Sequence, residues 1–330
     1  MKAIVLEGQG KPLQLVDLPT PTPATGQVQV QLKAAALNRR DWWLQQGASR
    51  QPSVPGSDGT GIITAVGEGV SPDRIGKEVV ILPSLYWGDN PLAQSADFQI
   101  LGIPSQGTFA EYIVVPAENV YDKPTYLSFA ETAALPLAAL TGYRALFTQG
   151  NLKPGQNVLL TGIGGGVALF MLQIANQIGA NVYVTSGSAE KLERAKQYGA
   201  RGGVNYHDAD WVDQLKAASG NGFDLIVDSA AGNGFADLVK LAKIGGRIVF
   251  FGATRGNLPE LVPNALYSKQ LALIGTMMGS PDEFAAVLTF YEQHQLRPVI
   301  DDALPLAEAD QAIRKMTTSE QFGKIVLSIA

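Results

Sequence analysis

Residues 157–185, NVLLTGIGGGVALFMLQIANQIGANVYVT, decide the fold. The segments 157–161 and 181–185 are short and apolar, as buried strands are, and the stretch between them opens with glycines and continues as an apolar helix to Ile178. A strand, a turn, a helix and a second strand within about 30 residues form a βαβ unit. The stretch therefore predicts a doubly wound parallel sheet with a phosphate site at its first turn.

The glycine loop comprises Gly162, Gly164, Gly165 and Gly166 and is followed by Val167. Gly162 permits the tight turn, and Gly165 lets the backbone approach a pyrophosphate. The N-terminus of the following helix offers free N–H groups and its positive dipole end to phosphates. A glycine cluster also occurs in ordinary tight turns, but the complete strand–loop–helix context favours a dinucleotide cofactor.

The residues after the second strand indicate which cofactor is bound. NAD enzymes usually place Asp or Glu here to hold the ribose 2′-hydroxyl, whereas this chain has no acid before Glu190. Ser186, Ser188 and Lys191 provide two hydroxyls and one cation, which suit a 2′-phosphate. Ser188 also fits the cap of the next helix and Lys191 a solvated position, and these interpretations are compatible. We expect NADPH rather than NADH.

The rest of the chain divides into two kinds of sequence. Strand and helix patterns continue to alternate through 126–275, with strands at 223–228 and 246–252 and a helix break at Pro136, so this part is predicted to be the Rossmann domain. Residues 1–125 are β-rich, with strands around 28–32, 59–66 and 76–82 and a short helix over 41–47 that Asp41 could cap. The tail, 276–330, ends in a strand and is expected to rejoin the first domain.

Composition excludes several classes of protein. The chain has 330 residues, 46% hydrophobic and 17% charged, with a net charge of −5, which favours a packed globular protein and argues against a nucleic-acid partner. It has no cysteine and only His207 and His294, so disulfides and thiolate metal sites are excluded and a zinc site is disfavoured. No signal peptide or transmembrane pattern is evident, so we expect a cytoplasmic protein without a membrane partner.

Several motifs resemble those of the medium-chain dehydrogenase/reductase superfamily, specifically its zinc-free quinone oxidoreductase-like branch. The resemblance covers essentially the whole chain and rests on AAALNRRDWWLQQG (34–47), PGSDGTGIITAVGEGV (55–70), GTFAEYIVVP (107–116), ETAALPLAALTGYRAL (131–146), LKPGQNVLLTGIGGGVA (152–168), GGRIVFFGA (245–253) and FGKIVL (322–327). It implies a GroES-like β-rich catalytic domain over 1–125 and 276–330, with a Rossmann domain inserted between its parts and the active site in the cleft between them.

The sequence departs from the zinc-dependent relatives at the metal ligands. Where these relatives carry a ligand cysteine, this chain has Asn38, and where they carry Gly-His-Glu, it has Gly56, Ser57 and Asp58. The four-cysteine lobe of the relatives has no counterpart in 83–107. The resemblance therefore implies a dismantled zinc site and no zinc cofactor.

The resemblance also implies further cofactor contacts. Tyr206 matches a residue beside the adenosine phosphate, and Lys324 matches one near the nicotinamide ribose. Positions along the nicotinamide are matched by Thr141, Phe250, Phe251 and Gly252. Each has a plainer interpretation, because the aromatic residues could be ordinary core residues and Lys324 a surface charge.

A site without a metal restricts the chemistry. Reducing an isolated ketone builds alkoxide charge that needs a Lewis acid or a strong proton donor, and no Tyr-x-x-x-Lys pair is present. A quinone, enal or enone spreads that charge, so these acceptors are favoured. The Asn38 amide is the first candidate donor, although it also fits a turn before the 41–47 helix. Asp41 suits a structural role better than a proton relay, and Tyr86 is a substrate contact or a surface aromatic.

Three functions remain open at this point. The favoured one is an NADPH-dependent quinone or enone oxidoreductase; the others are a low-turnover NADPH-binding protein with a structural or sensing role and a carbonyl or alcohol dehydrogenase. Residues 269–275 form an apolar edge with few charges, which invites pairing with a second chain. Relatives commonly pair there, so we expect a homodimer.

Overall fold

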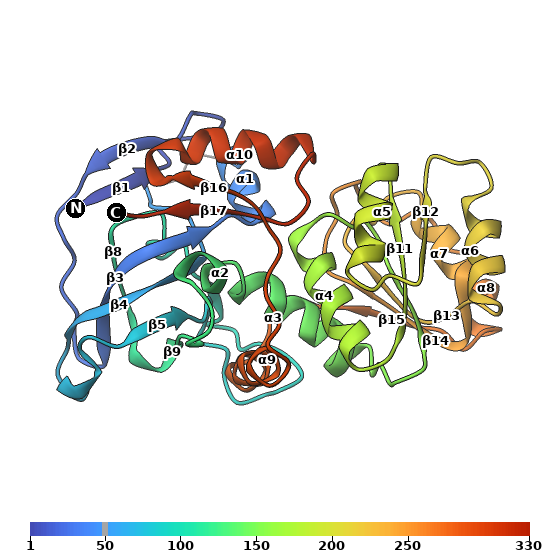
Figure 1. Cartoon of the computed structure of the whole chain (residues 1–330), viewed down its shortest axis with the longest axis horizontal. Helices are drawn as coiled ribbons and strands as arrows, with labels where there is room; N and C mark the ends of the chain where they lie inside the picture. Colours follow the sequence, from blue (N-terminus) through green and yellow to red (C-terminus); the bar gives the residue numbers. More distant parts are fainter. Residues whose placement is uncertain (48–51) are drawn as a thin grey trace. The chain divides into compact units, whose positions relative to one another are not determined.

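The computed structural model describes residues 1–47 and 52–330. The chain divides into two compact units: unit 1 contains Met1–Leu140 and Gly279–Ala330, and unit 2 contains Thr141–Met278. In Figure 1 both ends of the colour scale, blue and red, lie in unit 1, and the middle of the scale forms unit 2. Unit 2 is therefore an insertion in unit 1, the topology that the resemblance implies.

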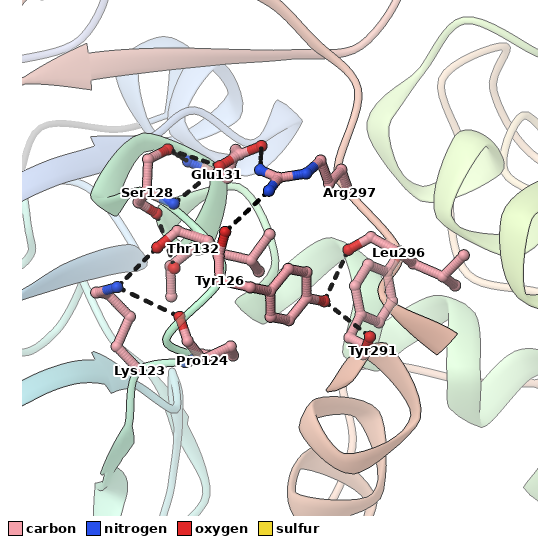
Figure 2. Close-up of polar contacts among 10 residues, drawn as sticks. Lys123, Pro124, Tyr126, Ser128, Glu131, Thr132, Tyr291, Leu296 and Arg297 are labelled. Atoms are coloured by element: carbon pink, nitrogen blue, oxygen red, sulfur yellow. Dashed lines mark hydrogen bonds and ion pairs between the residues drawn. The ribbon is translucent and has the colours of Figure 1, made fainter. Parts of the chain in front are cut away.

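The first boundary differs from the expected one, because residues 126–140 belong to unit 1 rather than to the Rossmann domain. Their contacts explain the difference (Figure 2). The Tyr126 hydroxyl lies 2.7 Å from the main-chain oxygen of Tyr291, and Arg297 forms a 2.6 Å ion pair with Glu131. These bonds tie the segment to the C-terminal part of unit 1. The helical composition of 128–148, which suggested a Rossmann segment, carries no information about these partners.

Unit 1 is built on a mostly antiparallel sheet. In the described part of the chain its strand order is β16-β17-β3-β4-β5-β9, and β8 also pairs with β3. The strands of this sheet are β3 (Gln27–Ala36), β4 (Asp58–Val66), β5 (Glu78–Ile81), β8 (Tyr112–Pro116), β9 (Val120–Asp122), β16 (Ile300–Pro305) and β17 (Lys324–Ser328). Two smaller pairs are formed by β1 (Lys2–Val5) with β2 (Gln14–Asp17) and by β6 (Ser84–Leu85) with β7 (Gln99–Ile100).

Alternation in β3 orients its side chains. Val28, Val30 and Leu32 are fully buried in the core of unit 1, each contributing about 1.5–3 kcal/mol of burial free energy. The final strand, β17, lies between β16 and β3 in the sheet order. It pairs antiparallel with β3 and parallel with β16. The tail thus rejoins the first domain as predicted.

The helices of unit 1 follow the predicted start and stop signals in part. They are α1 (Arg39–Gln46), α2 (Phe129–Ala133), α3 (Pro136–Arg144, which runs into unit 2), α9 (Pro281–His294) and α10 (Ala309–Thr318). Pro136 begins α3, so the predicted break is confirmed. Asp41 is not the N-cap itself, because the extended residue Asn38 precedes α1 in that position. Asp41 is the third helical residue and contributes to the capping box, since its carboxylate accepts from the Asn38 amide.

Unit 2 is a parallel sheet whose order is β12-β11-β10-β13-β14-β15 within the described residues. Its strands are β10 (Asn157–Leu160), β11 (Asn181–Ser186), β12 (Gly202–Asn205), β13 (Phe223–Asp228), β14 (Ala242–Phe250) and β15 (Ala272–Gly275). Its helices are α4 (Gly166–Gln177), α5 (Ala189–Gln197), α6 (Trp211–Ser219), α7 (Phe235–Leu241) and α8 (Pro263–Tyr267). Successive strands are added outward from β10 in opposite directions, which places the switch point, the usual ligand site, at the carboxyl ends of β10 and β13.

The last strand of this order is shorter than the sequence suggested. It covers 272–275 rather than 269–275, because the main chain turns at Gln270, which has a φ of 51°, and the Leu271 amide donates back to the Leu266 carbonyl instead of joining the ladder. The strand still forms one edge of the sheet, and the homodimer stays a prediction. In the described residues no helix is long and apolar enough to span a membrane.

Candidate functional site

The glycine loop leads from β10 into α4 with the geometry that its glycines require. Gly162 and Gly164 have φ angles of 68° and 114°, which disfavour any residue with a side chain. The loop is fixed to β11, because the amide of Ile163 donates to the carbonyl of Thr185 over 2.8 Å and that of Gly162 donates to the Thr185 hydroxyl.

The space above the loop is open at Gly165. A Cβ added there would contact only the carbonyl oxygen of Gly162, at 3.8 Å. Gly165 is the N-cap of α4, and Gly166 and Val167 begin the helix without a side-chain cap on their N–H groups. Uncapped amides beside open space are the features that a pyrophosphate needs, so a dinucleotide fits this end of unit 2.

The residues predicted for the 2′-phosphate gather at the carboxyl end of β11. Ser188 caps α5, accepting from the Lys191 amide, and its own amide donates to the Ser186 hydroxyl, so both serines have local structural bonds. The Lys191 side chain lies along the glycine loop, because a Cβ on Gly164 would be 2.8 Å from its Cδ and 3.2 Å from its Nζ. Tyr206 follows β12 and donates its amide to the Ser186 carbonyl. The structure thus brings these four residues together.

The other expected cofactor positions have visible packing roles. Phe250 makes an edge-to-face contact with Phe235 in the core of unit 2. Gly252 is required by close approach, since a Cβ there would lie 2.4 Å from the carbonyl oxygen of Ser229. Phe251 donates its amide to the Asp228 carbonyl, and Thr141 is buried in α3. Contacts of these residues with the nicotinamide stay predictions.

A buried polar cluster in unit 1 contains Asn38 and Lys324. The Lys324 ammonium donates to Asn38 Oδ1 over 2.7 Å and to Asp58 Oδ2 over 3.0 Å. Asn38 Nδ2 donates to the same carboxylate oxygen, and the Leu137 amide donates to Asp58 Oδ1. Asp58 is fully buried and Lys324 is 4% exposed, so this is an internal ion pair and not the surface charge that one interpretation expected.

This cluster fixes the orientation of the Asn38 amide. An ammonium group only donates and an ionised carboxylate only accepts, so Oδ1 must face Lys324 and Nδ2 must face Asp58. Nδ2 has two hydrogens, and one of them is used on Asp58. The second can donate to a substrate oxygen, which is the role expected for Asn38.

The side chains of Asn38, Ser57 and Asp58, which match the metal-site segments of the zinc-dependent relatives, do not suit Zn²⁺. Asn38 and Asp58 already bind the ammonium of Lys324, and the Ser57 hydroxyl accepts from the Arg40 guanidinium over 2.9 Å. A divalent cation would have to displace one cation and lie near another, with ligands of low zinc affinity. The described residues also contain no group of three His, Cys, Asp or Glu side chains able to hold a metal.

Asp41 is buried on the other side of Asn38. Its Oδ2 accepts from the Asn38 amide over 2.8 Å, and its Oδ1 is buried without a hydrogen-bond partner among the described residues. Burial raises the pKa of Asp41 from 3.8 to about 6, and the nearby Arg40 opposes part of that rise. The geometry favours the structural role over a proton relay.

The raised pKa makes Asp41 a source of pH-dependent stability. Well below pH 3.8 the carboxyl is protonated in both states and its titration does not affect stability, whereas above pH 6 its ionisation destabilises the folded chain by about 3 kcal/mol. Asp41→Asn should therefore gain up to about 3 kcal/mol relative to the wild type between pH 4 and pH 8. Urea unfolding across this range checks it, with the exposed Asp73→Asn as a control. The prediction would be contradicted if the difference in free energy of unfolding between the wild type and Asp41→Asn did not change with pH.

Tyr86 lies apart from this cluster. It is 48% exposed, has a φ of 57°, and lines a hollow of about 800 Å³ together with Trp87, Asp89, Asp97 and Glu118. Its carbonyl accepts from the Ser95 hydroxyl. The structure therefore joins Asn38 and Asp41 through a hydrogen bond and does not connect Tyr86 to them.

Sequence reasoning missed Asp58, which belongs to this cluster, and Arg40, which binds the neighbouring Ser57. The resemblance identifies Asp58 only as the counterpart of a glutamate in the relatives, and the signal for its burial is its position among glycines and apolar residues. A carboxylate and a lysine that both lie within strand patterns, as Asp58 and Lys324 do, must be paired if both are buried.

Comparisons with known proteins agree with both units. The alcohol dehydrogenase GroES-like domain family matches residues 24–125, and the zinc-binding dehydrogenase family matches residues 166–293. A zinc-type alcohol dehydrogenase-like protein, YogA, of Leptosphaeria maculans is 36% identical over 96% of this chain and 95% of its own length. The quinone oxidoreductase of Rattus norvegicus is 31% identical over 94% of this chain and 92% of its own length. The crystal structure of an NAD-dependent alcohol dehydrogenase is 38% identical, with a TM-score of 0.95 over the full length of both chains.

A GroES-like unit that carries an inserted Rossmann unit with an open glycine loop defines an oxidoreductase of the nicotinamide-dependent class. The chain belongs to the medium-chain dehydrogenase/reductase superfamily.

Proposed function

We propose that this oxidoreductase is an NADPH-dependent, zinc-independent reductase of quinones and α,β-unsaturated carbonyls. The observation that carries the proposal is that Asn38 and Asp58 bind the ammonium of Lys324. Ser57 likewise binds the guanidinium of Arg40. The resemblance matches Asn38, Ser57 and Asp58 to the metal-site segments of the zinc-dependent relatives. The positive charges of Lys324 and Arg40, which are bonded to these side chains, repel a Zn²⁺ ion. The similarity to a quinone oxidoreductase supports the same class of acceptor.

In this mechanism the nicotinamide cofactor supplies the hydride when it is bound. The uncapped amides at the start of α4 would bind the pyrophosphate. Lys191 and Tyr206, with Ser186 at the end of β11 and Ser188 just after it, would hold the 2′-phosphate. The remaining N–H of Asn38 donates to the acceptor oxygen, and Lys324 and Asp58 keep that amide from rotating. The chain thus orients the reactants and stabilises charge through fixed dipoles.

The acceptor class follows from the strength of that stabilisation. One amide N–H and a buried ammonium that is already neutralised by Asp58 are weaker electrophiles than Zn²⁺. A quinone or enone spreads the developing negative charge over several atoms, so it needs less local stabilisation than a simple ketone. We therefore infer little oxidation of simple alcohols.

Two alternative functions, a dehydrogenase and a cofactor-binding protein, can be tested together with the proposed one. The NAD-dependent alcohol dehydrogenase structure and YogA favour an alcohol or carbonyl dehydrogenase that prefers NADH. A binding protein with little turnover needs the same glycine loop and differs only in rate.

A panel of acceptors run with NADPH and NADH in parallel separates these functions. We expect turnover of quinones or enones with NADPH, at least about tenfold tighter binding of NADPH than of NADH, and an unchanged rate after prolonged EDTA treatment. Primary alcohols with NADP⁺ serve as the control substrates. Ethanol oxidation that EDTA abolishes would overturn the proposal, and tight NADPH binding without turnover would favour the binding protein.

A further inference from the structure

The guanidinium of Arg255 lies over the ring of Tyr206, although the two residues come from different loops. The Arg255 Cζ is 4.4 Å from the centroid of the Tyr206 ring, within the range of a cation–π contact. Arg255 follows β14 and is exposed, and Tyr206 follows β12. In the described part of the chain the Arg255 guanidinium makes no hydrogen bond or ion pair, so its N–H groups are available to a ligand.

The main chain of Arg255 is held by the loop that follows β13. Its amide donates to the carbonyl of Ala230 over 2.8 Å. Asp228 shapes that loop, since its Oδ2 accepts from the amides of Ala230 and Ala231 and its Oδ1 accepts from Thr161. Ala231 adopts a φ of 54°, a conformation that residues other than glycine rarely take. The position of Arg255 is thus built into the backbone and does not depend on the stacking alone.

Tyr206 is held equally closely on the side of β11. A Cβ on Gly187 would lie 2.7 Å from the Tyr206 hydroxyl and 2.9 Å from Nε2 of His207, so only glycine lets these two side chains approach the end of β11. The rings of Tyr206 and His207 are 4.7 Å apart. A phenol, an imidazole and a guanidinium therefore meet beside the position where NAD enzymes carry an acid.

The chemistry of this cluster selects its ligand. A guanidinium that uses its face on an aromatic ring keeps its edges free, and these edges match the oxygens of a phosphate in pairs. The chain as a whole has a net charge of −5, so a cation held in place without an acidic partner marks a local anion site. We propose that Arg255 binds the 2′-phosphate of NADPH. Lys191 would contact this phosphate from the glycine loop, and Arg255 would contact it from the opposite side. The proposal rests on the proposed NADPH preference and assigns it a residue outside the β11–α5 segment.

The test is binding of the cofactors and of two fragments to the apo chain, measured by isothermal titration calorimetry. Adenosine 2′,5′-bisphosphate carries the phosphate in question, and 5′-AMP lacks it. We expect Arg255→Met to weaken NADPH and the bisphosphate about tenfold and to change NADH and 5′-AMP less than about twofold. Arg255→Lys should keep part of the affinity, because it retains the charge without the planar fork.

Arg201→Met is the matched control. Arg201 is an exposed arginine of the same unit that precedes β12, at the opposite end of the strand from Tyr206, and it hydrogen-bonds Asn181. It should leave all four affinities unchanged. A wild-type preference for NADPH that survives Arg255→Met, or an equal loss for NADPH and NADH, overturns the assignment and leaves the proposed function standing. A wild-type chain that binds 5′-AMP as tightly as the bisphosphate overturns both.

Discussion

Lys324→Met is expected to lower the free energy of unfolding of unit 1 by about 3–5 kcal/mol. The change removes the cation from a carboxylate that is fully buried and leaves Asp58 with the amides of Asn38 and Leu137 as partners. Breaking a buried ion pair from one side costs more than the pair itself contributes, because the remaining charge stays desolvated.

Tryptophan fluorescence can report this loss for unit 1 alone. Trp42, Trp43 and Trp87 lie in unit 1, and the fourth tryptophan, Trp211, lies in unit 2. In a Trp211→Phe background, the fluorescence change during denaturant unfolding therefore reports on unit 1 alone. With Trp211 present, the signals of two units that unfold separately would overlap.

Two further variants decide the cause. Replacing both partners, Lys324→Met with Asp58→Asn, should recover most of the loss, because no buried charge remains. Lys77→Met, at an exposed position of the same unit, should change the stability by less than about 0.5 kcal/mol. A Lys324→Met variant as stable as Lys77→Met would show that the pair is not buried in solution.

Gly165→Val is expected to abolish NADPH binding, with at least about a hundredfold rise in Kd, while unit 2 stays folded. The φ of Gly165 is −72°, which valine adopts, and its Cβ would meet only the Gly162 carbonyl at 3.8 Å. The two methyl groups would therefore extend into the space that we assign to the pyrophosphate.

Gly234→Val is a close control, because Gly234 is also a glycine N-cap, with a φ of −66° before α7, and no atom lies within 4 Å of an added Cβ. Calorimetric titration and thermal unfolding measured on both variants separate loss of binding from loss of fold. NADPH binding that is unchanged in Gly165→Val would place the phosphate site elsewhere.

Sequence patterns predicted the parts of this protein whose determinants are local. The strand–loop–helix–strand unit of 157–185, the break at Pro136 and the return of the final strand all appear in the structure, because each depends on periodicity, glycine or proline within a short window. The chain's family followed from motifs spread along its length and is shown by the comparisons.

The polar cluster was beyond such reasoning, because its members meet only after the sheet has formed. Asp58 and Lys324 are 266 positions apart, and they meet because β3 pairs with both β4 and β17 in a particular register. The α1 cap was misassigned for a related reason, since Asn38 and Asp41 both suit the start of a helix and the extended backbone at Asn38 decides between them.

The place of β17 inside the sheet of unit 1 has a consequence during synthesis. At about 5–20 residues per second, the ribosome needs roughly 13–50 s to proceed from Asp58 to Lys324, and for that time the nascent chain carries a carboxylate without its cation. Unit 2, which ends at Met278, emerges earlier and can fold on the ribosome. β8 and β4 can already pair with β3, but the end of β3 at 34–36 lacks its β17 partner, and this short exposed edge favours engagement by chaperones until the final strand arrives.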